Sequence, residues 1–283
     1  MPEAKDIDQE LERVAQSVGI PPCPGILIDL SAEAKKDDPD FRKIERLVSM
    51  DVGLSATLLK TVNSPFYGLR NKISTVSQAV SMLGLSMLSR TVTGLVLRNA
   101  FAGKDSISME HFWDASANKA MAAAFIARQL PGMDKDEFYT FGLFQNCGIP
   151  ILMQRFPQYK ETLGAANESP DRKFTEIEDE AHGTDHATMG YLLTKSWRLP
   201  EDLSQAIRYH HEYAMLSDEQ TTLSTKTQHL IAVGLLASHA IQTDSGLSLS
   251  LEWEKGGDTA LAHLGLTAHE FQEIADDLAQ LIG

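Results

Sequence analysis

The sequence predicts an all-α protein, and three observations support this prediction. Apolar residues recur at three- and four-residue spacing in almost every ordered segment, which is the period of an amphipathic helix. Several of these segments begin with a Ser, Thr or Asp that can cap a helix. No segment shows a convincing alternation of apolar and polar residues, which is typical of a strand. We therefore expect a multi-helical bundle with an N-terminal helical lobe.

The N-terminal lobe is predicted to contain short helices separated by stop signals. Asp51 can cap the fourth of them, and Thr75 with Gln78 can form a capping box for the fifth, which Gly84 ends. The polar stretch from Gly103 to Ser108 is the expected boundary of this lobe. The helices are expected at residues 7–18, 26–30, 41–48, 52–62, 76–83 and 86–100.

An aromatic loop follows the fourth helix. Asn63 tolerates left-handed backbone and Pro65 disfavours helical geometry in the residue before it, so the helix should end there. We expect the next two aromatic side chains, Phe66 and Tyr67, to be buried between the lobes. The residues interpreted as structural, holding this loop against the core, are Asn63, Ser64, Phe66, Tyr67 and Gly68.

The second lobe is also predicted to be helical. Its first helix has a face of small residues that permits close helix packing: Ala120, Ala123, Ala124 and Ala127. Pro150 suits the first turn of a short helix. The polar, turn-rich stretch 243–258 is predicted to be a loop. The other helices are expected at residues 111–130, 134–148, 175–182, 186–193, 200–211, 228–241 and 267–283.

One part of this lobe has a marked start and stop. Thr175 with Glu178 can form a capping box, Gly183 interrupts the helix, and Thr184 or Asp185 can cap the next one. Glu178 belongs to an acidic cluster over residues 176–180. Because acidic side chains near a helix start favour the helix dipole, we interpret this cluster as solvent-exposed.

Composition excludes several classes of function. The net charge of −14 argues against a nucleic-acid binder and against docking on anionic lipid. The two cysteines, Cys23 and Cys147, have no metal-binding spacing and predict no disulfide framework. We see no signal peptide and no apolar run long enough for a membrane span. The expected location is the cytoplasm.

The stretch from Asp51 to Gly84 resembles the HDOD domain family, the HD-related output domains of bacterial signalling proteins. The proline-rich entry from Ile20 to Pro24 also resembles this family, and the resemblance runs to about Tyr213. It implies an HD-domain-like bundle. The organisation expected is an N-terminal helix at 1–19, an HDOD domain at 20–217 with lobes to about 103 and from about 108, and a C-terminal helical extension at 218–283. The matching residues are Asp51, Leu58, Leu59, Asn63, Ser64, Phe66, Tyr67, Gly68, Ile73, Ala79, Val80, Leu83 and Gly84.

The resemblance also implies where a metal site would lie. Enzymes of the HD superfamily hold metal with a His, a His-Asp pair, further His residues and a late Asp, and the metal activates a water that attacks phosphate. Here the first position falls on Ala115, and the pair falls on Gln145 and Asn146. The late Asp has no match, and Ser238 is the nearest polar residue.

Three histidines remain that resemble the extra histidines of HD enzymes: His186, His210 and His211. They are a three-nitrogen metal site, buried histidines with satisfied hydrogen bonds, or partly exposed residues at a lobe junction. We expect Gln145 and Asn146 to lie near His186 and His210 and to close the old cleft with a hydrogen-bonded polar patch. Without an anionic ligand, no cofactor is expected, and divalent metal should bind weakly at most.

The resemblance and the damaged motif together predict a catalytically silent signal-transduction module. We expect it to work through contacts with unidentified signalling proteins, with a small-molecule ligand as a further option, and without nucleic acid or membrane. Two alternatives stay open. One is a metal-dependent phosphohydrolase that uses the residual histidines, and the other is a regulatory module that binds a nucleotide or another metabolite.

Overall fold

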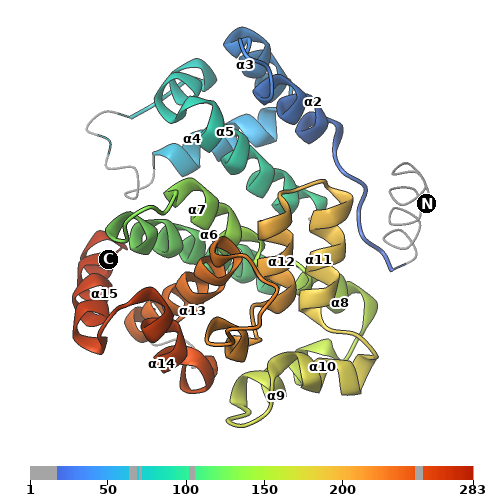
Figure 1. Ribbon diagram of the computed structural model, residues 1–283. Coiled ribbons are helices and arrows are strands. Elements are labelled where there is room, and N and C mark those ends of the chain that lie inside the picture. The colour runs from blue at the N-terminus through green and yellow to red at the C-terminus, as the bar shows by residue number, and fades with distance from the viewer. Residues whose placement is uncertain (1–17, 64–68, 70–71, 102–105, 246–250, 283) are drawn as a thin grey trace. The chain divides into compact units, whose positions relative to one another are not determined.

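The computed structural model describes residues 18–63, 69, 72–101, 106–245 and 251–282. These residues form helices and no strand, so the prediction of an all-α protein is confirmed. The chain forms two compact units, the N-terminal unit (residues 23–103, with 281–283) and the HD-like unit (residues 1–22 and 104–280) (Figure 1). The predicted helix at 7–18 and the residues Ser64, Phe66, Tyr67 and Gly68 lie outside the described residues.

The N-terminal unit contains four helices among the described residues, with a fully buried core that includes Leu30, Ile44 and Leu58. The predicted caps are present: the Asp51 carboxylate accepts from the Leu54 N–H at 2.9 Å, and Thr75 and Gln78 form a capping box. The helices are α2 (Gly25–Ala34), α3 (Phe41–Ser49), α4 (Val52–Val62) and α5 (Val76–Ala100).

Two residues control how α4 and α5 are connected. Asn63 bonds Ile73 across the intervening segment, donating to its carbonyl and accepting from its N–H, each at 2.8 Å. Gly84 has φ +68°, a left-handed conformation that breaks α5 into two arms, as the sequence predicts. Among the described residues, no single helix is both long and apolar enough to cross a membrane. The two arms of α5, which are bent by 114° relative to each other, are long and apolar enough only when they are taken together, and only by length and composition.

The HD-like unit is built around α6, which packs against both α7 and α13 (Figure 1). The small-residue face predicted for α6 is buried, and a Cβ on Gly142 of α7 would lie 2.5 Å from the Ala120 Cα. The two backbones therefore touch. The elements are α6 (Ser106–Gln129), α7 (Lys135–Phe144), α8 (Ile149–Arg155), α9 (Tyr159–Glu168), α10 (Phe174–His182), α11 (His186–Ser196), α12 (Glu201–Tyr209), η2 (Tyr213–Leu216), α13 (Thr225–Ser245), α14 (Glu252–Leu264) and α15 (Ala268–Ile282).

The structure corrects the sequence prediction in this unit. The stretch 243–258 is not one loop, because α13 continues to Ser245 and α14 begins at Glu252. Gly256 reads as a turn residue, yet it lies within α14, where an added Cβ would come within 2.3 Å of the Tyr213 ring. The glycine is thus needed for close packing. The helix α9, which the sequence analysis does not predict, separates α8 from α10.

Candidate functional site

Helix ends bring three histidines together. His186 is the first residue of α11, where the Asp185 carboxylate caps the helix by accepting from the Thr188 N–H at 2.7 Å. His210 caps the C-terminal end of α12, and His211 follows it. The prediction that both lie inside this helix is wrong, because the helix ends at Tyr209. Their positions therefore depend on where two helices start and stop.

The ring nitrogens of these histidines converge. The Nε2 atom of His186 lies 3.1 Å from Nε2 of His210 and 3.2 Å from Nε2 of His211. Candidate ligand atoms of the three residues all lie within 4.8 Å of one another. His186 and His210 are each 1% exposed, and the N–N distances of 3.1 and 3.2 Å leave no room for a water between the rings.

The opposite nitrogen of each ring has a fixed partner. Nδ1 of His186 lies 2.7 Å from the Glu178 carboxylate, and Nδ1 of His210 lies 2.8 Å from the Ile207 carbonyl. Nδ1 of His211 lies 2.6 Å from the Glu252 carboxylate. Because a carbonyl and an ionised carboxylate only accept, each Nδ1 must carry the hydrogen. An Nε2 atom that carries no hydrogen presents a lone pair to the other two rings, and an Nε2 that carries one donates to its neighbour.

Glu178 holds His186 from two sides. One of its oxygens accepts from both the backbone N–H and the ring of His186, and the other accepts from the Tyr159 hydroxyl. Burial acts to raise the pKa of this fully covered carboxyl, but His186 and Tyr159 outweigh it and lower the pKa. The prediction that the acidic cluster is solvent-exposed is therefore wrong for Glu178, which is fully buried. The predicted capping box of Thr175 and Glu178 is also wrong, because α10 has no side-chain cap.

Glu252 holds His211 in the same way. Tyr213 donates to the oxygen that His211 uses, at 2.8 Å, and Lys255 donates to the other oxygen at 2.7 Å. Burial opposes ionisation, yet His211, Lys255 and Tyr213 together lower the pKa of Glu252 to about 2. The carboxylate is ionised at neutral pH. By contrast, burial and the neighbouring His211 and His186 hold the pKa of His210 well below its usual value of 6.5.

The three histidines fit a divalent transition-metal ion. An ion bound tetrahedrally at about 2.0–2.1 Å from each nitrogen separates those nitrogens by about 3.3 Å. Two of the three pairs are close to this, at 3.1 and 3.2 Å, and the third lies within 4.8 Å. Oriented Nδ1 partners are typical of histidines that ligate metal. The expectation that an ion would meet only neutral groups is therefore incomplete, because Glu178 and Glu252 bring negative charge directly behind two of the rings.

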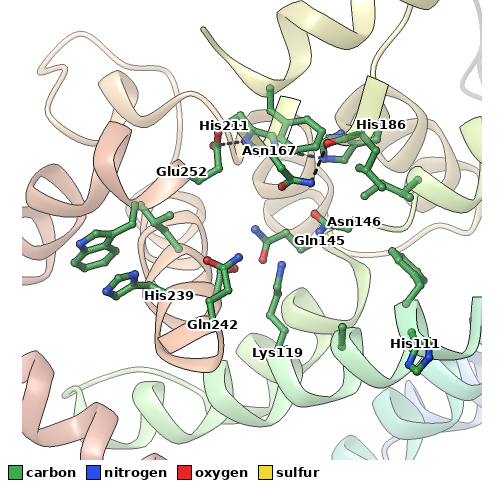
Figure 2. A pocket seen from close by; sticks show the side chains of 18 of the residues that line it. His111, Lys119, Gln145, Asn146, Asn167, His186, His211, His239, Gln242 and Glu252 are labelled. Atoms are coloured by element: carbon green, nitrogen blue, oxygen red, sulfur yellow. Dashed lines mark hydrogen bonds and ion pairs between the residues drawn. The ribbon is translucent and has the colours of Figure 1, made fainter. Parts of the chain in front are cut away.

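A cavity of about 570 Å³ opens beside the histidines. The positions that the sequence analysis mapped onto the damaged motif, Ala115, Gln145 and Asn146, line it together with His186 and His211 (Figure 2). Gln145 is 6% exposed, and its Oε1 has no hydrogen-bond partner. The expected hydrogen-bonded patch that closes the cleft is therefore wrong, since the cleft is hollow and one of the amides facing it is unsatisfied.

Two other polar residues, Ser238 and His182, take no part in this cluster. Ser238 lines the cavity, but its hydroxyl donates to the Gly234 carbonyl at 2.8 Å. His182 ends α10 and lies with its Nε2 2.9 Å from the Thr162 hydroxyl. Gly183, with φ +71°, separates it from α11, as expected.

The sequence analysis missed three charged residues of the site: Lys119, Glu178 and Glu252. A signal existed for two of them. Lys119 lies one turn after Ala115 on α6, and Glu178 lies one turn after the buried Phe174 on α10, so each shares a face with an inward residue. Glu252 had no such signal, because its helix was not predicted.

Comparison with known proteins agrees with this architecture. The described residues form a helical bundle with a buried histidine cluster. Residues 20–213 match the HDOD domain, and the chain belongs to the HDOD domain family. The resemblance stated from the sequence is confirmed.

Two solved structures share the fold. An HDOD domain protein of Geobacter sulfurreducens has a TM-score of 0.71 at 22% identity, covering 98% of this chain and 95% of that one. A candidate phosphohydrolase of Shewanella amazonensis SB2B has a TM-score of 0.69 at 21% identity, covering 94% and 93%. An uncharacterized protein of Treponema pallidum is 25% identical over 237 residues, or 79% of this chain. The chain spans less than half the length of the curated relatives it matches, 44% of this one.

Proposed function

We propose that this chain is a non-catalytic regulatory module of bacterial signalling whose HD-like unit holds one divalent transition-metal ion. The ligands are Nε2 of His186, His210 and His211. The observation that carries the proposal is the convergence of these three atoms while every Nδ1 is bonded elsewhere. Nitrogen lone pairs at this spacing repel one another unless a cation, either a metal ion or a ring proton, lies between them.

The regulatory part of the proposal rests on what has replaced the enzyme motif. The HDOD family resembles metal-dependent hydrolases, but the His-Asp pair expected there is Gln145 and Asn146, and Ala115 replaces the first histidine. Neutral amides cannot supply the anionic ligand that such a centre uses. When bound, the ion supplies a fixed positive charge at one end of the cavity. His186 and His211 position it there, and Glu178 and Glu252 keep the rings oriented.

One observation favours a second candidate, a metal-dependent phosphohydrolase. A set of three histidines beside an open cavity is also the pattern of catalytic zinc sites, which keep one coordination position free. The fold shared with the Shewanella candidate phosphohydrolase agrees with both readings, because at 21% identity it shows the fold alone.

Elemental analysis tests the metal site. Protein purified without added metal, or incubated with zinc, manganese, iron or nickel and desalted, should retain about one ion per chain. His186→Ala should lower the affinity by about a hundredfold or more. The control is His269→Ala, because that ring is 83% exposed on α15. Retention of less than 0.1 ion per chain under all of these conditions would contradict the metal site.

Hydrolysis assays separate the two candidates. The metal-loaded protein is offered phosphomonoester and phosphodiester substrates, and the regulatory reading expects no turnover above the His186→Ala background. Turnover that His186→Ala abolishes and His269→Ala retains would establish the hydrolase instead.

The proposed cytoplasmic partner is a signalling protein, and its capture from the native cell should depend on the wild-type histidines.

A further inference from the structure

Lys119 is a cation at the wall of this cavity. It lies on α6 and points into the cavity toward Gln145 (Figure 2). In the described part of the chain its ammonium makes no hydrogen bond or ion pair, whereas Lys255, Lys226 and Lys36 each reach a carboxylate within 2.8 Å. Burial lowers the pKa of Lys119 to about 8, and Glu252 opposes this only in part. At pH 7 the side chain is still mainly charged.

The nearby carboxylate is already committed. One oxygen of Glu252 bonds Lys255, and the other bonds both His211 and Tyr213. Glu252 therefore acts on Lys119 only through space. A shielded ammonium with no counter-ion of its own is energetically unfavourable, and such groups are usually matched by a ligand or by a paired side chain.

Gln145 is a second, independent sign of a missing ligand. It follows α7 on the opposite wall from α6, is 6% exposed, and has an Oε1 atom with no hydrogen-bond partner. More than nine in ten buried polar groups in proteins have a partner. A cation with no ion-pair partner among the described residues and an unsatisfied amide oxygen thus face the same cavity from different elements.

The remaining walls suit an organic molecule. His239 stacks on Trp253 with ring centroids 4.0 Å apart and an interplanar angle of 11°, and burial lowers the pKa of His239 so that this platform is neutral. Phe112 and Leu235 also line the space. Its volume of about 570 Å³ lies within the range of small-molecule sites, roughly 300–1,000 Å³, and far exceeds a bare ion.

We propose that this cavity binds a small organic anion, whose charged group pairs with Lys119, whose hydrogen-bond donor or polar edge meets Gln145, and whose apolar body packs on the Trp253 wall. The proposal rests on the proposed function, since it names the class of ligand that the regulatory module would sense. A carboxylate and a phosphate share the required chemistry. The chain has a net charge of −14, which repels anions in general. The local positive charge of Lys119 is therefore the feature that attracts an anion to this cavity.

Three matched probes test the charge requirement: benzoate, phenylphosphonate and the neutral benzamide. They are titrated by calorimetry into the full chain, first with a chelator present and then after metal loading. At least one anion should bind more tightly than benzamide, and Lys119→Met should weaken that anion at least about tenfold, because a charge-assisted bond is lost. Lys135→Met is the control, since this lysine is exposed on α7. The ratio of benzoate to phosphonate affinity distinguishes the two sources of charge.

A measurement on the wild-type chain covers the case in which Lys119→Met does not fold. An acylating reagent labels lysines in proportion to their neutral fraction, and mass spectrometry resolves Lys119 from Lys135. The bound anion should protect Lys119 at least about threefold and leave Lys135 unchanged. Equal affinity of both anions for wild type and Lys119→Met would overturn the proposal. Absence of binding and of protection at 10 mM probe, which is about ten times a Kd of 1 mM, would overturn it as well. Because the chelated arm needs no metal, failure of the metal site leaves this result readable on its own.

Discussion

Both units bury a glutamate, but they use it differently. In the N-terminal unit, Glu33 is fully covered, and its oxygens accept from Lys36, Lys43 and the Asp40 N–H, all between 2.8 and 3.0 Å. These bonds lower the pKa of Glu33 to about 2. Every partner is a cation or a backbone donor of the same unit.

In the HD-like unit, the two buried glutamates bond histidines that belong to the histidine cluster. Glu178 and Glu252 each bond one ring nitrogen of a histidine, and the other nitrogen of that ring faces the histidine cluster. A buried carboxylate by itself thus indicates only that its charge is compensated. What marks a site is a network that orients several possible ligand atoms toward one point, as these imidazoles do. Four predictions follow this contrast, in order of decreasing effect.

Glu178→Ala should have the largest effect. It removes the acceptor for the backbone and ring of His186 and for Tyr159, so the free energy of unfolding should fall by about 3 kcal/mol or more. Metal affinity should fall by about 10–100-fold, because the ring loses its orientation. Urea unfolding with a chelator and a metal titration measure the two quantities, and Glu178→Gln serves if the alanine variant does not fold.

Glu33→Ala is the matched change in the other unit. It should also lower stability, but it should leave the metal affinity within twofold, since its partners are Lys36, Lys43 and Asp40. If Glu33→Ala and Glu178→Ala reduced metal affinity equally, the contrast between the two glutamates would be lost.

Acid should destabilise the HD-like unit through Glu252. The folded pKa of about 2 lies below the ordinary value of 4.5, so this carboxylate stabilises the fold above pH 4.5 and the contribution is lost as pH falls toward 2. At about 1.4 kcal/mol per pKa unit, the loss is about 3 kcal/mol. Denaturation of chelated protein between pH 5 and 2.5 measures it, and Glu252→Gln should flatten the profile. An unchanged slope in Glu252→Gln would assign the acid sensitivity to other groups.

Restoring the motif should give a third, smaller effect. The triple change Ala115→His, Gln145→His and Asn146→Asp adds two imidazoles and a carboxylate to the wall shared with His186 and His211. Metal affinity, or the number of ions held per chain, should rise, with a gain of about tenfold for added ligands that are not yet oriented by partners. Calorimetric titration and elemental analysis measure it. No gain in either would mean that the motif is mapped onto the wrong helix.

The sequence allowed much of the fold to be predicted but only part of the site. Apolar spacing and caps such as Asp51 and the Thr75–Gln78 pair are local, and the structure contains them. The beginning of α14 was missed because Gly256 looks like a turn residue, and only the approach of Tyr213 explains it as helical. Glu178 was misread for a related reason. Whether a charged side chain near a helix start faces solvent or a buried histidine depends on packing between distant segments, which local patterns do not contain.

The smallest expected effect belongs to the capping box of the N-terminal unit. Thr75 accepts from the Gln78 N–H at 3.2 Å, and the Gln78 side chain accepts from the N–H groups of Ser74 and Thr75. Thr75→Ala should cost about 1 kcal/mol of stability, the usual effect of losing such a cap. Chemical denaturation measures this loss, and metal titration should show an affinity within twofold of wild type, because no atom of the histidine cluster is involved. A larger change in metal affinity would show that the helices of the N-terminal unit control the site energetically. That result would replace the contrast between the units with a coupling between them.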